Sequence, residues 1–176
     1  MSEGAPKDVV MRELSGVEKL LMYIPGYGGY KEKEIRRETD RLVRNKAATF
    51  LESATKNMDR TLVSAIEKFG PDKSRVINRI MFQLNYINNR TTKSALGYSG
   101  LFDAVKVKEE DIDMLIDNDQ VLISIAEEVD RKGKEILECA LRGDFDGLSK
   151  ALDEISGLLS QMEQKLTARE VLLRGV

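Results

Sequence analysis

Side chains able to bind a phosphate backbone gather on one face of a helix that the sequence predicts over residues 72–93. At about 100° per residue, four cations of this segment fall within an arc that also holds two aromatic rings. The residues of this arc are Arg75, Arg79, Phe82, Tyr86, Arg90 and Lys93. Cations pair with phosphates and aromatic rings stack on bases, so this composition is typical of nucleic-acid or other anion binding.

A second basic arc lies earlier in the chain and consists of Lys33, Arg37, Arg41 and Arg44. The alternative interpretation is a solvated helix surface. Glu32 and Arg36 lie four residues apart, as do Asp40 and Arg44, and such pairs support an exposed helix while cancelling charge. For the later arc, the corresponding alternative is burial of Phe82 and Tyr86 under the first helix, which is predicted to begin near residue 8 and to end at Pro25.

Several kinds of chemistry are excluded by what the chain lacks. It contains no histidine and one cysteine, Cys139, so Ser-His-Asp and Cys-His catalysis and an intrachain disulfide are impossible within it. Acidic residues cluster over residues 109–119, but Leu115 and Ile116 stand where a calcium loop needs an oxygen ligand and a glycine. We therefore expect a non-enzymatic protein with no catalytic residue, no metal and no cofactor, and with Cys139 in the core.

The composition favours amphipathic helices, with 41% hydrophobic, 33% charged and 6% aromatic residues among 176. Charge is unevenly distributed: residues 31–93 hold 15 basic and 8 acidic side chains, while residues 94–176 hold 10 and 18. Either the two halves neutralise each other, or the basic half meets an anion. No apolar run is long enough to span a membrane and no signal-peptide core follows Met1, so we expect a cytoplasmic protein.

These patterns predict an all-α fold, an elongated bundle of about five helices. Residues 1–7 are expected to be disordered and residues 8–176 to form a single domain, beginning with a helix that ends at Pro25. Two long antiparallel hairpins follow, one from residues 31–69 and 72–93, the other from residues 108–141 and a helix starting near residue 144. Gly70-Pro71 and Gly143 provide the turns, whereas Gly133 is predicted to weaken its helix.

The two long hairpins are expected to differ in how completely they are buried. Residues 31–46 carry a thin apolar thread and are predicted to be an exposed arm, while residues 47–69 form core. The last helix has a regular apolar seam typical of coiled-coil packing, formed by Phe145, Leu148, Leu152, Ile155, Leu159, Met162 and Leu166. Arg169 interrupts this seam, so residues 167–176 are predicted to end the bundle or to leave it.

Two glycine-tyrosine turns carry a resemblance to known proteins. Residues 24–31 read Ile-Pro-Gly-Tyr-Gly-Gly-Tyr-Lys, and residues 97–103 read Gly-Tyr-Ser-Gly-Leu-Phe-Asp. Both resemble motifs of a family of small, uncharacterised prokaryotic all-helical proteins. The resemblance implies a helical fold and no activity or site residue. The expected function is that of a self-associating helical interaction or scaffold protein that binds proteins or forms homo-oligomers, with nucleic-acid or anion binding as the alternative.

Overall fold

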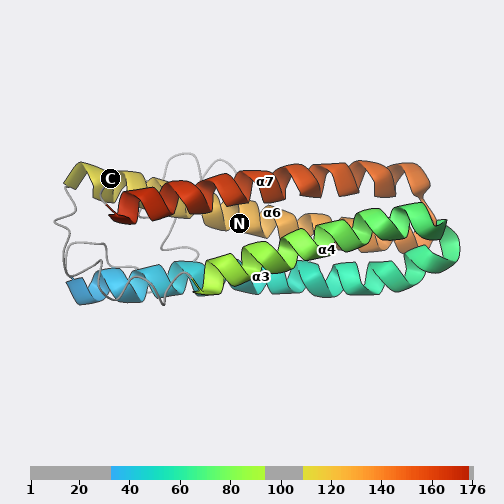
Figure 1. Ribbon diagram of the computed structural model, residues 1–176, viewed down its shortest axis with the longest axis horizontal. Helices are drawn as coiled ribbons and strands as arrows, with labels where there is room; N and C mark the ends of the chain where they lie inside the picture. The colour runs from blue at the N-terminus through green and yellow to red at the C-terminus, as the bar shows by residue number, and fades with distance from the viewer. Residues whose placement is uncertain (1–32, 94–108, 175–176) are drawn as a thin grey trace, which may run out of the picture.

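The computed structural model describes the backbone of residues 33–93 and 109–174, with the side chains of residues 41–92, 114 and 117–171. This part of the chain is all-helical and contains α3 (Lys33–Lys68), α4 (Gly70–Lys93), α6 (Glu109–Arg142) and α7 (Phe145–Arg174), labelled as in Figure 1. The four predicted helices of the two hairpins are therefore confirmed within a few residues. The predicted N-terminal helix and both glycine-tyrosine turns lie outside the described residues.

The four helices pack as a bundle made of two hairpins laid side by side. α3 and α4 run antiparallel, as do α6 and α7, and both connecting turns lie at the same end of the bundle (Figure 1). α3 contacts α6 as well as α4, and α7 contacts α4 as well as α6. Each hairpin thus places a helix beside a parallel helix of the other. We call the opposite end, where α3 and α6 begin and α7 ends, the open end.

The core follows the apolar periodicity of each helix. Fully buried positions on α3 include Ala47, Leu51, Ala54 and Met58, as predicted for residues 47–69. The inward faces of the other helices are also buried, at Ile77, Ile80, Leu84, Ile87, Leu122, Ala126, Val129, Ile136, Ala140, Leu148, Leu152, Ile155, Leu159, Met162 and Leu166. Phe145 departs from the predicted seam because it sits at the first turn of α7, where its ring is exposed and packs beside Phe69.

The two turns form as their glycines predict. Gly70 has a φ of 77° and follows the end of α3, while Gly143 has a φ of 74° and follows the end of α6. After α6, the amides of Gly143 and Asp144 donate to the carbonyls of Ala140 and Cys139 at 3.2 and 3.0 Å, which is a Schellman motif. Asp144 then caps α7, since its Oδ1 accepts from the Gly147 amide at 2.9 Å.

Gly133 was expected to weaken α6, and its role in the fold is different. It is buried at the contact between α6 and α3, where a Cβ atom at this position would lie 3.1 Å from Ala54 Cα and 3.3 Å from Ala54 Cβ. Two small residues therefore let the two helix backbones approach closely. The entropic cost of a helical glycine is offset by this contact.

The prediction that Arg169 interrupts the bundle is wrong. α7 continues to Arg174, and the Arg169 side chain is buried, with Nε donating to Asp119 Oδ1 at 2.5 Å and Nη2 to Oδ2 at 3.3 Å. Asp119, which belongs to the acidic cluster over residues 109–119, is also fully buried. The pair satisfies two charges inside the bundle between α6 and α7 near the open end.

The described start of α3 is more buried than an exposed arm would be. Val43 is fully buried and the Arg44 side chain is only 5% exposed, while Leu42 is half-buried against the core. The arm prediction is therefore wrong for residues 42–44, and the side chains of residues 33–40 lie outside the described part. None of the helices in the described ranges is both long enough and apolar enough to span a bilayer.

Candidate functional site

The packing of one side of α4 in the core determines which of its residues face solvent. Ile77, Ile80, Leu84 and Ile87 are buried against the other helices, so the opposite side of α4 is turned to solvent. That exposed side comprises Arg75, Asn78, Arg79, Phe82, Asn85, Tyr86 and Asn89. These seven residues span a helical arc of about 120°, and we call them the outer face of α4.

Both aromatic rings of this surface are accessible. Phe82 is 75% exposed and Tyr86, one turn further along the helix, is 49% exposed. The alternative from the sequence placed both rings under the N-terminal helix, which lies outside the described residues. Phe82 and Tyr86 lie four residues apart, so their side chains are neighbours on the helix surface.

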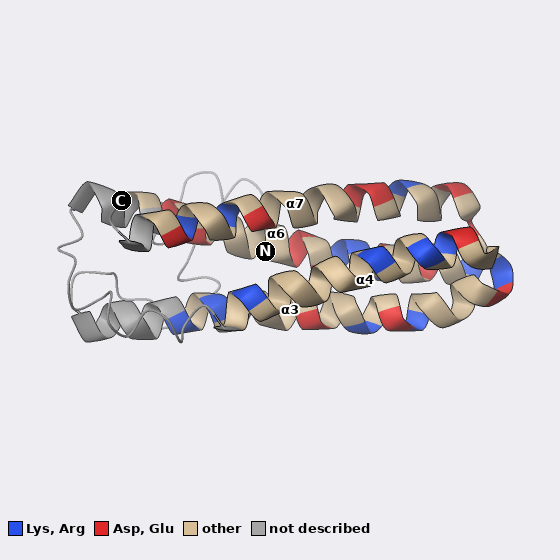
Figure 2. Cartoon of the chain, in the orientation of Figure 1, with Lys and Arg blue, Asp and Glu red and all other residues tan. Residues whose placement is uncertain are grey.

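α4 carries many more basic than acidic residues. Its sequence holds five basic residues and a single acidic one, Asp72, in the first turn. Figure 2 shows this distribution, with Lys and Arg along the helix. Arg75 Nη2 lies 3.3 Å from Asp72 Oδ1, yet the Arg75 side chain remains 77% exposed. Arg79 has no ion pair with any residue that the structure describes, so the outer face of α4 presents two accessible guanidinium groups.

Sequence reasoning missed three members of this surface. Asn78, Asn85 and Asn89 are exposed on the same arc as the two aromatic rings. They add amide groups, which both donate and accept hydrogen bonds, and no carboxylate lies among them. The signal was available in the helical spacing. Asparagine is neither charged nor aromatic, so an arc defined by charged and aromatic residues did not include these three positions.

Arg90, in contrast, is directed to α7. Its Nε and Nη2 donate to the two carboxylate oxygens of Glu170 at 3.2 and 3.1 Å, and Nη2 also donates to Thr167 Oγ1 at 2.8 Å. Nη1 lies 3.6 Å from Glu163. The hydrogen bonds to Glu170 raise the pKa of Arg90 above its usual range. Arg90 therefore joins the basic and acidic halves of the chain instead of facing a ligand.

The structure describes two side chains of the earlier basic arc, and one of them is exposed. Arg41 is exposed on α3, whereas Arg44 is buried in the bundle. The side chains of Lys33, Arg37 and Lys93 lie outside the described residues. Of the ten predicted site residues, the structure thus brings four together, namely Arg75, Arg79, Phe82 and Tyr86.

A second surface feature runs along the outside of the α6–α7 hairpin. Near the open end it is a groove of about 510 Å³, whose lining is mainly apolar. Its lining residues are Met114, Asp117, Asn118, Val121, Lys165, Ala168 and Val171. Met114 and Val171 are about half exposed, at 57% and 48%, so apolar side chains meet solvent here.

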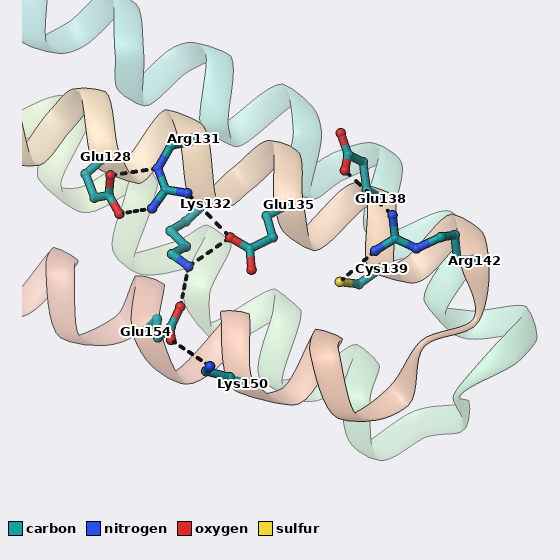
Figure 3. A network of polar contacts seen from close by, with 9 residues as sticks. All are labelled: Glu128, Arg131, Lys132, Glu135, Glu138, Cys139, Arg142, Lys150 and Glu154. Carbon is teal, nitrogen blue, oxygen red and sulfur yellow. Dashed lines mark hydrogen bonds and ion pairs between the residues drawn. The ribbon is translucent and has the colours of Figure 1, made fainter. Parts of the chain in front are cut away.

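Towards the turns, the same hairpin carries a network of ion pairs (Figure 3). Lys132 Nζ donates to Glu135 at 2.8 Å and also bonds Glu154 on α7. Arg131 bonds Glu128 on the same helix. The bond from Lys132 lowers the pKa of the Glu154 carboxyl, and that from Arg131 lowers the pKa of Glu128. The network joins α6 to α7 across their solvent side.

Two features of the described residues bear on metal and thiol chemistry. No group of three metal-binding side chains occurs among them. Cys139 is buried, as predicted, and burial raises the pKa of its thiol although Arg142 Nη2 lies 3.7 Å from the sulfur. A thiol with a raised pKa is a poor nucleophile at neutral pH. The surfaces that remain are suited to binding.

Comparisons of the chain with known protein families, with curated proteins and with solved structures gave no match. The resemblance to small prokaryotic helical proteins stays a prediction, because it depends on two turns outside the described residues.

Proposed function

We propose that this protein is a non-enzymatic helical interaction protein that binds its partner through the outer face of α4. The observation that carries the proposal is the 75% exposure of Phe82 one turn from the half-exposed Tyr86. Single exposed apolar residues are ordinary on protein surfaces. Two adjacent rings beside the accessible guanidinium of Arg79 combine residue types that are enriched at binding sites.

The rest of the helix supports this proposal by being a rigid platform. Four apolar side chains anchor α4 in the core, and Arg90 fixes its far end to α7 through the bidentate bond with Glu170. A surface held in this way loses little conformational entropy when it binds. A cytoplasmic location is part of the proposal, since the single cysteine leaves the fold independent of an oxidising compartment.

Site-specific photo-crosslinking tests the proposal. A benzophenone-bearing phenylalanine analogue placed at position 82 should give covalent adducts in an extract of the source cells. The matched control is the same analogue at Val63, an apolar residue on α3 that is 66% exposed. Adducts that form equally well at both positions, or at neither, would contradict binding through α4.

A second candidate function, self-association, is favoured by the groove of the α6–α7 hairpin. A two-fold contact sets one surface against its own copy. The groove suits such a contact because an acidic residue, Asp117, and a basic one, Lys165, line it together with its apolar residues, so each carboxylate can face the ammonium group of the other copy. The expected assembly is a homodimer in which Met114, Val121 and Val171 of both copies are buried together.

Light scattering coupled to gel filtration tests this assembly over a range of protein concentrations. The wild-type protein should be dimeric, and Val121→Glu should make it monomeric by placing a charge in the apolar contact. Val63→Glu, on the solvent side of α3, is the control and should leave the dimer intact. A wild-type protein that remains monomeric at millimolar concentration would exclude the homodimer.

A further inference from the structure

The outer face of α4 has a composition that selects among possible partners. Of its seven residues, two are cations, two are aromatic and three are asparagines, and all seven are exposed. A stable protein–protein contact is built around a contiguous apolar centre depleted of charge. Here each ring is bordered by polar side chains, and none of the seven residues is acidic, while the Asp72 carboxylate beside the face is paired with Arg75.

We propose that the outer face of α4 binds single-stranded nucleic acid, with bases stacked on Phe82 and Tyr86 and phosphates paired with Arg75 and Arg79. This inference rests on the proposed function and names its partner. An aromatic ring on a helix surface can stack on a base only if that base is not already paired and stacked in a duplex. The exposure of both rings therefore favours a single strand.

The three asparagines fit the same partner. Asn78, Asn85 and Asn89 flank the rings on one side, while Arg79 flanks them on the other. An asparagine amide can donate and accept at the edge of an unpaired base. Arginines pair with phosphate oxygens. The face thus has a side suited to bases and a side suited to the backbone.

Its dimensions also match a short strand. From Arg75 to Asn89 the helix rises by about 21 Å. At the spacing of about 3.4 Å per nucleotide that a strand has in a duplex, this length accommodates at most about six nucleotides, because an unpaired strand is more extended. Lys132, Arg131 and the other cations of the α6–α7 network are already bonded to carboxylates, so they do not extend this face.

The small number of cations leads to a specific expectation for salt dependence. Each phosphate neutralised on a single strand contributes about −0.7 to the slope of log K against log salt concentration. With Arg75 and Arg79 as the two contacts, the slope should be about −1.4. A protein that bound nucleic acid merely as a polycation would show a much steeper slope.

The experiment measures fluorescence anisotropy of a labelled 12-nucleotide DNA of mixed sequence, its RNA equivalent, the DNA duplex and an abasic strand of equal length. The full-length protein should bind both single strands and should bind the duplex and the abasic strand at least about tenfold more weakly. Loss of one stack should weaken binding by about tenfold, so Phe82→Ser and Tyr86→Ser should each show this effect. Val63→Ser is the matched control and should bind as the wild type does.

Variants that alter charge separate the two kinds of contact. Arg79→Gln should reduce the salt slope by about 0.7, whereas Arg60→Gln, at an exposed position on α3, should leave it unchanged. Equal binding of the abasic strand, or no binding at about 50 mM salt, would overturn the inference. So would Phe82→Ser binding as tightly as Val63→Ser.

The failure of this inference can be told apart from the failure of the proposed function. Crosslinked adducts at position 82 whose size is unchanged by nuclease would identify a protein partner. That outcome would overturn nucleic-acid binding and leave the interaction function of α4 in place. Absence of adducts at position 82 would remove both.

Discussion

At the scale of single residues, the fold depends on a charge pair inside the bundle. Asp119 on α6 and Arg169 on α7 are both buried, and two hydrogen bonds join them. Removing one partner of a buried pair takes away much of the compensation of the other charge, which typically costs about 3–5 kcal/mol. Asp119→Asn should therefore lower the free energy of unfolding by several kcal/mol, as measured by urea denaturation followed by circular dichroism.

An exposed pair on the same hairpin provides the control. Arg131 is 60% exposed where it bonds Glu128, and exposed pairs contribute at most about 1 kcal/mol. Glu128→Gln should thus have a small effect. If Asp119→Asn were no more damaging than Glu128→Gln, the buried pair would not be holding α7 to α6.

This pair also shows what sequence reasoning could not supply. Asp119 and Arg169 are fifty residues apart, and neither belongs to an apolar stripe. Periodicity assigns a charged residue to the solvent side of a helix, so it did not predict the burial of Asp119 and treated Arg169 as an interruption of the apolar seam. Only the packing of α6 against α7 shows that the two charges compensate each other in the interior.

At the scale of helices, the contact of α3 with α6 depends on Gly133. A Cβ atom there would lie 3.1 Å from the Cα of Ala54, so the backbone of α3 would have to move. Gly133→Ala gains about 1 kcal/mol in helix propensity but disturbs this close packing. Because the atom that it meets is backbone, we expect a net loss of about 1–2 kcal/mol, measured as a lower urea midpoint.

Gly157 on α7 is the matched control for this prediction. It is exposed, and a Cβ atom there would have no neighbour within 4 Å. Gly157→Ala should raise the free energy of unfolding by about 0.5–1 kcal/mol, since only the propensity gain remains. Stabilisation by both substitutions would show that the contact between α3 and α6 can accommodate a methyl group at position 133.

The helices themselves could be predicted because their signals are local. Apolar residues recur at helical spacing, and Gly70, Pro71 and Gly143 mark the ends of helices in the usual order. The candidate site could be predicted only in part. Arg79 and Arg90 share one arc of α4, yet Arg90 meets Glu170 while Arg79 faces solvent. The position of α7 determines which of the two arginines is paired, and that position cannot be predicted from the sequence of α4.

At the scale of the whole molecule, the two hairpins place their turns at one end of the bundle. This arrangement brings basic side chains of α3 and α4 close to acceptor groups of α6 and α7. Lys68 at the end of α3 donates to the carbonyl of Leu141 at 2.7 Å, which sets a cation at the C-terminus of α6. Arg90 joins α4 to α7 nearer the open end. The unequal halves of the chain are thus partly neutralised within the bundle, while Arg75 and Arg79 stay available.

The surface network of the α6–α7 hairpin makes the stability of the molecule depend on acidity. Hydrogen bonds from Lys132 and Arg131 lower the pKa values of Glu154 and Glu128 below 4.5, their ordinary value. Above pH 4.5 both carboxylates are ionised in the folded and unfolded states, so the stabilisation is present in full. As pH falls from about 4.5 through the lower folded pKa values, the unfolded state binds protons first and the stabilisation is lost.

Lys132→Met tests this dependence because it removes the bond that lowers the pKa of Glu154. Urea denaturation at a series of pH values from 7 to about 3 should show a smaller acid-induced loss of stability for Lys132→Met than for the wild type. Lys56→Met, at an exposed position on α3, should follow the wild-type curve. About 1 M salt should also reduce the wild-type loss, since exposed pairs are screened. Parallel curves for Lys132→Met and the wild type would mean that other carboxylates control the acid limit of this bundle.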